Sequence, residues 1–317
     1  MSWAQVTVCI ATHKRCSGLA KLLGSLVAQQ GAPPFDVIVV DNDKEKSAEA
    51  VALEFRDKLQ LTYLVEPVRG IARTRNRAIA SSRSPFLAFI DDDEWALPGW
   101  LTAFDRARSS YHADALVGPV EIEFDPEVSE LVRNCGLFGA MRPAQKPSAG
   151  NRHVRGLPPE GVELRWYYGA TSNAYVRRDA LPDREAPFST RFDLIGGSDV
   201  DLFKRMIDAG SRLMACSNAV VVEHRPLARA NFAWILRRAL RNGVQYAEFT
   251  WPSMPLPMRL GRGLRCGYAG SKKWLQAGRV WRGDRSAAGR HVVAGGAEVG
   301  KLLYALGIQI HEYRHHP

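Results

Sequence analysis

The sequence predicts an α/β fold with a mostly parallel sheet, followed by a basic helical extension. Through the first hundred residues, short runs of β-branched and apolar residues alternate with segments of helical spacing, which is typical of βαβ units. The distribution of charge also divides the chain into two regions. Residues 1–224 carry a net charge of −2 and residues 225–317 a net charge of +12, which together give the +10 of the whole chain. We therefore expect an α/β domain over 1–227, with halves of about 1–98 and 99–227, and a helical subdomain over 228–317.

Each element of the first half has a local reason. The apolar runs predict strands over 6–10, 35–40, 61–65 and 85–90. The spacing of Leu19, Leu22, Leu23 and Leu26 predicts a helix that begins near Ser17, a residue suited to the N-cap. Two more helices are expected between the later strands, over 47–58 and 70–80.

The later elements follow from similar signals. The sequence predicts, in order, a helix over 101–110, a strand over 115–124, a Pro-, Gly- and Arg-rich loop over 141–161, a strand-like segment over 167–176, a Gly-rich turn opening a helix over 192–206, and a last strand over 212–222. The remainder is expected to form basic amphipathic helices interrupted at 252–257.

The cysteines and the termini indicate the compartment. Five cysteines are scattered without C-x-x-C spacing, which disfavours a disulfide framework or a zinc site and favours a reducing compartment. The N-terminus lacks the features of a secretory signal, and no run reaches the roughly 18 apolar residues of a spanning helix. We expect a cytoplasmic protein.

Acidic residues follow the fourth predicted strand, where Asp91, Asp92, Asp93 and Glu94 stand together. Asp41 and Asp43 end the second strand, and Thr12 follows the first. The carboxyl ends of parallel strands meet at one sheet edge, which is the usual ligand crevice of such folds. Crowded carboxylates repel unless a cation neutralises them, and hard divalent cations prefer carboxylate oxygen. The alternative is an acidic turn or a helix N-terminus, where acidic residues are also favoured.

Five segments together carry a resemblance to a known family. They are residues 8–15, 37–43, 70–77, 89–98 and 196–202, in the family's order and spacing. In these segments the sequence resembles the family 2 glycosyltransferases of the GT-A fold, particularly the bacterial exopolysaccharide and cell-surface glycan type. The resemblance covers residues 6–224, about two-thirds of the chain.

The resemblance implies an inverting enzyme that moves a sugar from a nucleoside diphosphate sugar, UDP-linked by expectation, to a hydroxyl of a glycan or lipid-linked acceptor. It implies Mg²⁺ or Mn²⁺ as cofactor. The residues Asp91-Asp92-Asp93 match the family's Asp-X-Asp motif, with Asp93 as the metal ligand and Asp91 nearer the ribose or sugar and also within reach of the metal. The same likeness assigns further residues to the nucleotide sugar: Thr12, Asp41, Asp92, Arg69, Arg73 and Asn76. For the last three, an exposed basic helix face is the alternative.

The catalytic base and a third metal ligand are also implied by the resemblance. Asp199 stands where the family has its catalytic Asp, although Ser198 replaces the usual Glu, which leaves Asp201 as an alternative. Asp199 would lie in the first helical turn and face the cleft, while Asp201 points elsewhere. N-terminal capping is the structural alternative for Asp199. His224, after the last predicted strand, is a candidate metal ligand or simply a polar surface residue.

Two other functions compete with glycosyl transfer. A sugar nucleotidyltransferase would need a Gly-rich loop after the first strand, where this chain has Ala-Thr-His-Lys-Arg. A non-catalytic nucleic-acid or membrane-binding protein could use the basic tail with its four tryptophans, but no nucleic-acid motif supports binding to nucleic acid. We expect residues 228–317 to dock on an anionic membrane surface, which would place the enzyme peripherally on the cytoplasmic face of the inner membrane.

Overall fold

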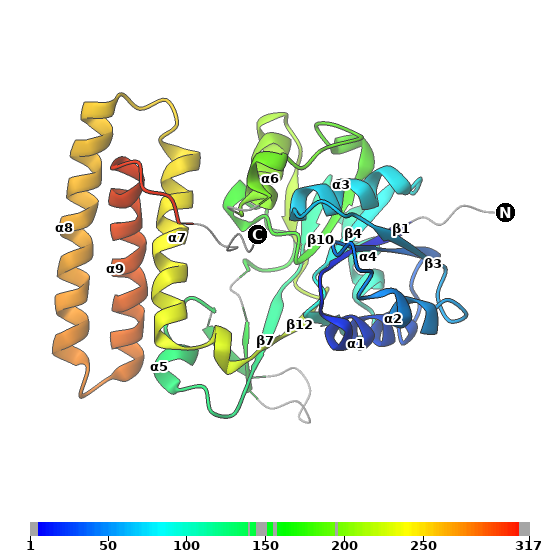
Figure 1. The fold of residues 1–317 in the computed structure, drawn as a ribbon, viewed down its shortest axis with the longest axis horizontal. Coiled ribbons are helices and arrows are strands. Elements are labelled where there is room, and N and C mark those ends of the chain that lie inside the picture. The colour runs from blue at the N-terminus through cyan, green and yellow to red at the C-terminus, as the bar shows by residue number, and fades with distance from the viewer. Residues whose placement is uncertain (1–5, 139, 144–150, 155–156, 194–195, 311–317) are drawn as a thin grey trace. The chain divides into compact units, whose positions relative to one another are not determined.

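The computed structural model describes residues 6–138, 140–143, 151–154, 157–193 and 196–310 (Figure 1). Its internal contacts divide the chain into two compact units. The first unit comprises Met1–Glu121 and Gly156–Glu223, and the second comprises Ile122–Arg155 and His224–Pro317. Each unit has its own secondary structure and core, so they are described in turn.

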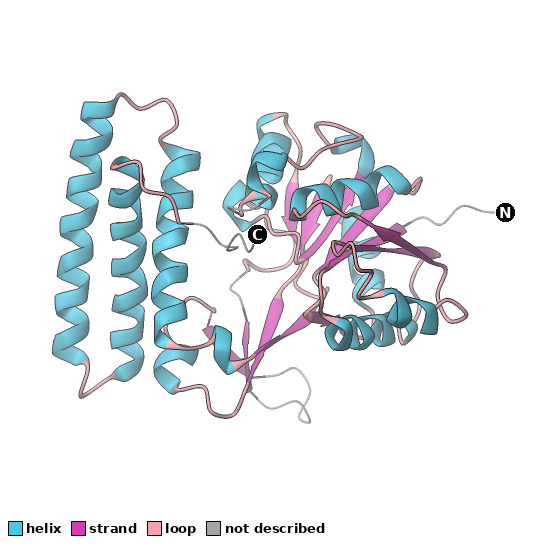
Figure 2. Cartoon of the chain, in the orientation of Figure 1, coloured by secondary structure: helices cyan, strands magenta, loops and turns pink. Residues whose placement is uncertain are grey.

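A seven-stranded sheet forms the centre of the first unit (Figure 2). Its order is β11-β6-β10-β4-β1-β2-β3, and its strands are β1 (Val6–Thr12), β2 (Phe35–Asp41), β3 (Leu61–Val65), β4 (Phe86–Ile90), β6 (Ala115–Val117), β10 (Asn173–Arg177) and β11 (Leu213–Ala215). The sheet is parallel except at β10, which runs antiparallel to both β4 and β6. The predicted mostly parallel α/β sheet is therefore confirmed.

Helices supply the apolar cover of this sheet. They are α1 (Cys16–Val27), α2 (Glu49–Glu54), α3 (Ile71–Ser81), α4 (Trp100–Tyr111) and α6 (Ser198–Asp208). Residues of α1 and α4 share one buried cluster with Val6, Val8 and Ile10 of β1, whereas α3 and α6 share a second cluster with Cys9. Because side chains alternate across a strand, the two clusters lie on opposite faces of the sheet.

Helix boundaries differ from expectation in two places. The first helix begins at Cys16 with Arg15 at its N-cap, so the prediction of Ser17 as the N-cap is wrong. The helix expected over 47–58 is regular only in α2, and a series of turns follows it.

Two predicted strands are each divided in the structure. The segment 115–124 forms β6 and β7 (Val120–Phe124), which belong to different sheets. The break falls at Gly118, where an added Cβ would overlap the carbonyl oxygen of Ala219. The segment expected as one strand over 212–222 forms β11 and β12 (Val221–Arg225).

A short strand was not predicted. β5 (Glu94–Ala96) pairs antiparallel with β12 and places Glu94 opposite Glu223. A three-residue run containing a charged residue carries no periodicity, so only its tertiary partner identifies it.

The middle of the chain also departs from expectation. The strand-like segment over 167–176 opens with a 3₁₀ turn (Trp166–Tyr168) before β10. The loop expected over 141–161 contains the end of β8 (Ala140–Pro143) and β9 (Asn151–Val154), which pair antiparallel. Residues 144–150 and 155–156 of that loop lie outside the described residues.

The second unit is mainly helical, as expected of the basic extension. Its helices are α5 (Glu130–Arg133), α7 (Phe232–Thr250), α8 (Leu256–Val280) and α9 (Arg285–Ala305). A small buried cluster joins Ile122, Val132, Phe138 and Ile235. No helix in the described part of the chain is both long and apolar enough to cross a membrane.

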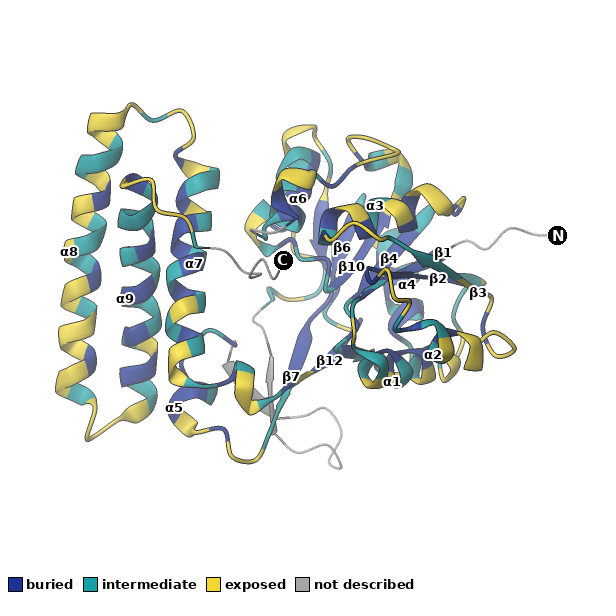
Figure 3. Ribbon diagram, in the orientation of Figure 1, coloured by how far each residue is buried: buried dark blue, intermediate teal, exposed yellow. Residues whose placement is uncertain are grey.

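Glycines bring the long helices together. Gly243 of α7 and Gly300 of α9 are buried, and a Cβ on either would overlap backbone of the facing helix. Gly263 and Gly270 of α8 are likewise buried against α9. Figure 3 colours the buried positions of these helices dark blue. Small residues let helix backbones approach closely, which explains why this unit tolerates so many glycines in helix interiors despite their poor helix propensity.

Candidate active site

The acidic motif lies where the parallel strands end, as the sequence predicts. Asp92 is buried, and its Oδ2 accepts hydrogen bonds from Thr12 Oγ1 at 2.9 Å and from the His13 amide at 3.4 Å. Arg15 donates to its Oδ1 at 2.7 Å. Burial raises the pKa of Asp92 to about 6, although the neighbouring Arg15 opposes that rise. Asp92 therefore joins the end of β1 to the end of β4.

The outer carboxylates of the motif each face an arginine. Arg15 donates to Asp93 Oδ2 at 2.9 Å, and Arg75 donates to Asp91 Oδ1 at 3.0 Å. Burial raises the pKa of Asp91, and the charges of Asp93 and Asp199 add to that rise while Arg75 opposes it. Asp91 and Asp199, distant in sequence, therefore share one electrostatic environment.

Two glutamates lie beneath this motif. Glu94 and Glu223 are both buried and oppose one another across the β5–β12 pair. Burial, with the charges of Asp91 and Glu223, raises the pKa of Glu94 well above its usual range. Glu94 Oε2 also accepts the Asp91 amide at 3.1 Å, which fixes the backbone at the start of the motif.

Asp41 is fully buried at the end of β2, directly opposite Thr12 of β1. Its Oδ2 accepts the Ala48 amide at 2.8 Å and the Tyr63 hydroxyl at 2.9 Å, and its Oδ1 accepts the Asp43 amide at 3.1 Å. These bonds hold the turn that follows β2. The structure confirms that Thr12 and Asp41 lie at one edge, while contact between Asp41 and a base stays a prediction.

Asn42 connects this turn to the start of α3. Its Nδ2 donates to the carbonyl oxygens of Glu66 and Val68, both at 2.8 Å, and its Oδ1 accepts the Gly70 amide at 2.9 Å. The Asn42 carbonyl also lies 2.9 Å from His13 Nδ1. One residue thus fixes two loops at the sheet edge.

The residues predicted along the diphosphate path have protein partners. The Asp193 carboxylate accepts the Ala72 amide at 2.9 Å, the Arg73 amide at 3.2 Å and Arg73 Nε at 3.0 Å. Asp193 therefore supplies the anion that a helix N-terminus favours, and Gly70 leaves room for it because a Cβ there would overlap the carboxylate.

The other two residues of that group are also engaged. Asn76 exchanges two hydrogen bonds with the backbone of Phe188, at 2.8 and 2.9 Å, so it joins α3 to the 188–193 segment. Arg69 is exposed and contacts His13 Nε2. Burial, and then the charge of Arg69, lowers the pKa of His13. Roles for Arg69, Arg73 and Asn76 on the donor stay predictions.

Asp199 and Asp201 have different surroundings in α6. Asp199 Oδ1 accepts the Val200 amide at 2.9 Å, one residue along the helix. Asp201 instead forms an ion pair with Arg205 Nη2 at 2.8 Å and a 2.9 Å hydrogen bond from Arg205 Nε. Gly196 and Gly197, both with positive φ, form the turn that opens α6. The carboxylate of Asp201 is thus committed within its own helix.

The candidate metal ligands are spread over both units. Asp91 and Asp93 belong to the first unit, while His224 belongs to the second, where its Nε2 lies 2.9 Å from Asp125 Oδ1. Among the described residues, no group of three or more His, Cys, Asp or Glu is arranged to hold a metal ion. Metal binding by His224 stays a prediction.

Sequence reasoning missed several residues that complete this site. Arg15, Arg75 and Asp193 are paired with acids or helix amides on other elements, so no local sequence pattern indicates them. Thr171 and Ser172 immediately precede β10, whose Asn173 lies opposite Ile90, the residue before the motif. Within the described structure, both hydroxyls are buried without a hydrogen-bond partner.

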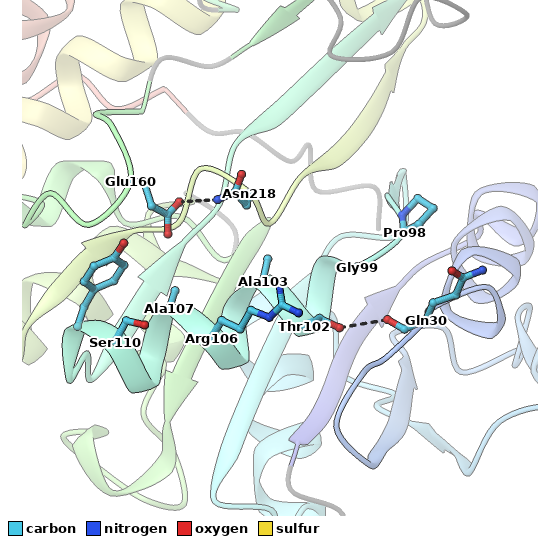
Figure 4. Close-up of a pocket in the computed structure, with 11 residues that line it drawn as sticks. Gln30, Pro98, Gly99, Thr102, Ala103, Arg106, Ala107, Ser110, Glu160 and Asn218 are labelled. Carbon is cyan, nitrogen blue, oxygen red and sulfur yellow. Dashed lines mark hydrogen bonds between the residues drawn. The ribbon is translucent and has the colours of Figure 1, made fainter.

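A separate hollow of about 560 Å³ runs along α4 (Figure 4). Thr102, Arg106 and Ser110 of that helix line it, with Glu160 and Asn218 opposite. None of the predicted site residues lines it, so it is distinct from the acidic motif.

A mostly parallel sheet that gathers an Asp-Asp-Asp motif and a strand-end threonine at one edge defines a glycosyltransferase of the GT-A class. The family model described as Glycosyl transferase family 2 matches residues 7–141. The chain is 31% identical over 247 residues to the succinoglycan biosynthesis protein ExoM of Rhizobium meliloti (strain 1021), covering 77% of this chain and 74% of that protein. The chain belongs to glycosyltransferase family 2.

Other relatives and structures agree with this class. The chain is 27% identical over 212 residues to the glycosyltransferase AglE of Haloferax volcanii, covering 66% of this chain and 63% of that protein. Its fold is similar to S. aureus TarS 1-349 in complex with UDP-GlcNAc, with a TM-score of 0.53, 14% identity and coverage of 96% and 92%; it spans 44% of a longer TarS structure.

A third similar structure is the mannosyltransferase PcManGT from Pyrobaculum calidifontis in complex with GDP-Man and Mn²⁺. Its TM-score is 0.52, its identity 20%, and the match covers 80% of this chain and 66% of that one. Membership of the family decides against the sugar nucleotidyltransferase and non-catalytic alternatives.

Proposed function

We propose that this enzyme transfers a sugar from a nucleoside diphosphate sugar, with UDP as the first nucleotide to test, to a hydroxyl of a glycan or lipid-linked acceptor, with inversion. The observation that carries the proposal is the acidic motif at the end of β4, whose buried Asp92 is hydrogen-bonded to Thr12 at the end of β1. The charge of Asp199 adds to the rise in the pKa of Asp91, which supports a candidate base close to the motif. The UDP-GlcNAc and GDP-Man bound to the similar structures support a sugar-nucleotide donor.

Asp91 and Asp93 would hold Mg²⁺ or Mn²⁺. Hard cations of this kind are commonly bound by one or two carboxylates together with substrate phosphates, and these two carboxylates flank the buried Asp92, which fixes the backbone between them. The Mn²⁺ complex of the mannosyltransferase supports the choice of metal. When bound, the cation would neutralise charge on the departing diphosphate.

Asp199 would act as the general base. It would accept the proton of the acceptor hydroxyl while that oxygen bonds to the donor's C1 and the bond from C1 to the diphosphate oxygen breaks. Attack opposite the leaving group inverts the configuration, and the nucleoside diphosphate departs. The pairing of Asp201 with Arg205 supports Asp199 as the base, because Asp201 would have to give up that ion pair.

The remaining residues would position the donor. Thr12 and Asp41 lie at the ends of β1 and β2 and would border the nucleoside, while Asp92 keeps both strand ends together. Arg69, Arg73 and Asn76 would lie beside the diphosphate, and His224 would be a third ligand of the cation. The resemblance to a succinoglycan biosynthesis protein supports a role in polysaccharide biosynthesis, which we propose takes place at the cytoplasmic side of the inner membrane.

A donor screen tests the proposal. Purified protein is incubated with UDP-, GDP- and dTDP-sugars in Mn²⁺ or Mg²⁺, and release of free nucleoside diphosphate is scored with and without EDTA. We expect release from one nucleotide class and its loss in EDTA. Release that persists in excess chelator would overturn the metal assignment. Formation of a nucleoside triphosphate and a sugar 1-phosphate when pyrophosphate is added would contradict glycosyl transfer.

A further inference from the structure

The solvent-facing side of α8 combines exposed apolar residues with positive charge. Leu264, Tyr268 and Leu275 are 64%, 63% and 66% exposed. Their spacings of four and seven residues place them on one stripe of the helix, because residues four and seven apart nearly coincide in angle. Three large apolar side chains on one helix face, all nearly two-thirds exposed, form a patch that has no packing role within the unit.

Packing within the unit uses a different face of α8. Gly263, Gly270 and Ala277, each seven residues from the next, are the buried residues of the helix. Gly263 faces Ala305, and Gly270 faces Gly295, both in α9. The apolar stripe is therefore not the side by which α8 joins its unit.

Cationic side chains border the stripe along its whole length. Arg265, Lys272 and Arg279 repeat every seven residues and form a parallel row beside it, and all three are exposed. The Lys272 ammonium lies 4.6 Å from the ring centre of Tyr268. No acidic residue occurs anywhere in α8, so the row and the stripe together form a surface that is both positive and apolar.

The nearby acidic residues do not cancel this charge. Asp284 Oδ1 accepts the Ala287 amide at 2.8 Å and caps α9. Glu298 pairs with Lys301 at 2.7 Å. Both carboxylates have partners in α9, and although Glu298 lines one hollow with Arg265, the row sets three cations against that one acid.

We propose that this face of α8 docks the protein on an anionic phospholipid bilayer. Apolar side chains beside a row of Lys and Arg fit the boundary between acyl chains and anionic headgroups, and Lys and Arg stems can lie along apolar surface while their charges reach the phosphates. A nucleic acid would satisfy the charge but would leave two exposed leucines against a polar backbone. A bilayer satisfies both halves of the surface.

Flotation of the full chain with vesicles of phosphatidylcholine alone, or mixed with phosphatidylglycerol, tests the proposal. We expect binding to the anionic vesicles, and weaker binding as salt rises. The double variant Arg265→Gln/Lys272→Gln should bind about 30-fold more weakly, and Leu264→Asn/Leu275→Asn about 10-fold more weakly. The matched controls Lys44→Gln and Leu53→Asn alter an exposed cation and an exposed leucine of the first unit, and should bind like the unaltered protein.

Several results would overturn the proposal. Equal binding to neutral and anionic vesicles would do so, as would binding of the α8 variants at the unaltered level. A change in sedimentation of the leucine variant, without a change in flotation, would assign the face to a second copy of this chain; salt-sensitive duplex DNA binding without flotation would assign it to nucleic acid. Melting curves and donor turnover of the variants should be unchanged, so failure here is distinct from failure of the transferase proposal.

Discussion

The buried charges of the two units have opposite signs. In the described part of the first unit the buried charged residues are all acidic, namely Asp41, Asp43, Asp92, Glu94, Glu121, Asp193 and Glu223, whereas those of the second are Arg225 and Arg241. Burying a charge is costly unless it is paired or hydrogen-bonded. In the first unit several of these acids, such as Asp41 and Asp92, lie at or just after strand ends, where substrates of such folds bind.

The interiors differ in a second way. The first unit fills both faces of a sheet with large side chains, including Trp100, Phe104 and Phe203. The second brings helix backbones together at glycines such as Gly243 and Gly300. We learn from the difference that one chain keeps its chemistry where side chains from several strands converge, and leaves the outer faces of simply packed helices for contacts with other molecules.

The largest expected effect concerns the acidic motif. Asp93→Ala should lower turnover by about 10³-fold or more, because one of two carboxylates proposed to hold the cation is lost. Nucleoside diphosphate release and Mn²⁺ binding by calorimetry should fall together. Unchanged Mn²⁺ binding would remove Asp93 from the metal site. It would also weaken the view that the acidic residues of the first unit carry the chemistry.

The next effect separates two carboxylates of one helix. Asp199→Asn preserves the shape of the side chain, but an amide cannot accept the proton of the acceptor hydroxyl. Transfer should therefore fall by about 10²-fold while donor binding persists. Asp201→Asn loses only the ion pair with Arg205, and its activity should change by less than about threefold. If Asp201→Asn is the inactive variant, the base is misassigned.

Glycine substitutions should distinguish the helical unit. Gly300→Ala places a methyl group against the carbonyl of Leu240, and should lower the free energy of unfolding by about 3 kcal/mol through overpacking. Gly261→Ala is the matched control, because a Cβ there meets nothing within 4 Å, and should raise it by about 0.5–1 kcal/mol. Urea unfolding followed by circular dichroism measures both. Equal effects would mean that backbone contact does not set the helix spacing.

A smaller effect should appear as a pH dependence of stability. The pKa of Asp92 is raised to about 6 from 3.8, so between these values the folded protein binds more protons than the unfolded chain. The contribution of Asp92 to stability should therefore be greatest below about pH 4 and should fall as the pH rises through 6, by at most about 3 kcal/mol.

Asp92→Asn isolates that contribution. In chelator, the variant should match the unaltered protein near pH 4 and be the more stable of the two at pH 7. Thermal unfolding across this range measures the difference. A constant difference at all pH values would show that Asp92 does not titrate between pH 4 and 6.

Much of the α/β fold could be predicted because its strands are local features. The four N-terminal strands are apolar runs with turn residues on each side, and each lies where the sequence places it. The segment 115–124 could not be divided from sequence, since the break at Gly118 depends on Ala219, a hundred residues away. The three-residue β5 depends in the same way on β12.

The site shows the same limit. The acidic motif was predictable because its residues are adjacent and end a strand. Arg15 and Arg75, which face its carboxylates, carry no signal of their own because the residues they meet lie on other elements, 77 and 16 residues along the chain. Arg73 is paired with Asp193, which lies 120 residues along the chain. No sequence spacing predicts that Asp193 lies at the start of α3.

Asn42 carries a consequence for how this protein can vary. Its amide donates twice and accepts once, to three backbone groups in the 66–70 connection. Aspartate would lose both donors, serine is too short to span the three groups, and glutamine is one methylene too long for the same geometry. Of these side chains, only asparagine can form all three hydrogen bonds at position 42. Engineering that changes the length of the 66–70 connection should therefore keep Asn42.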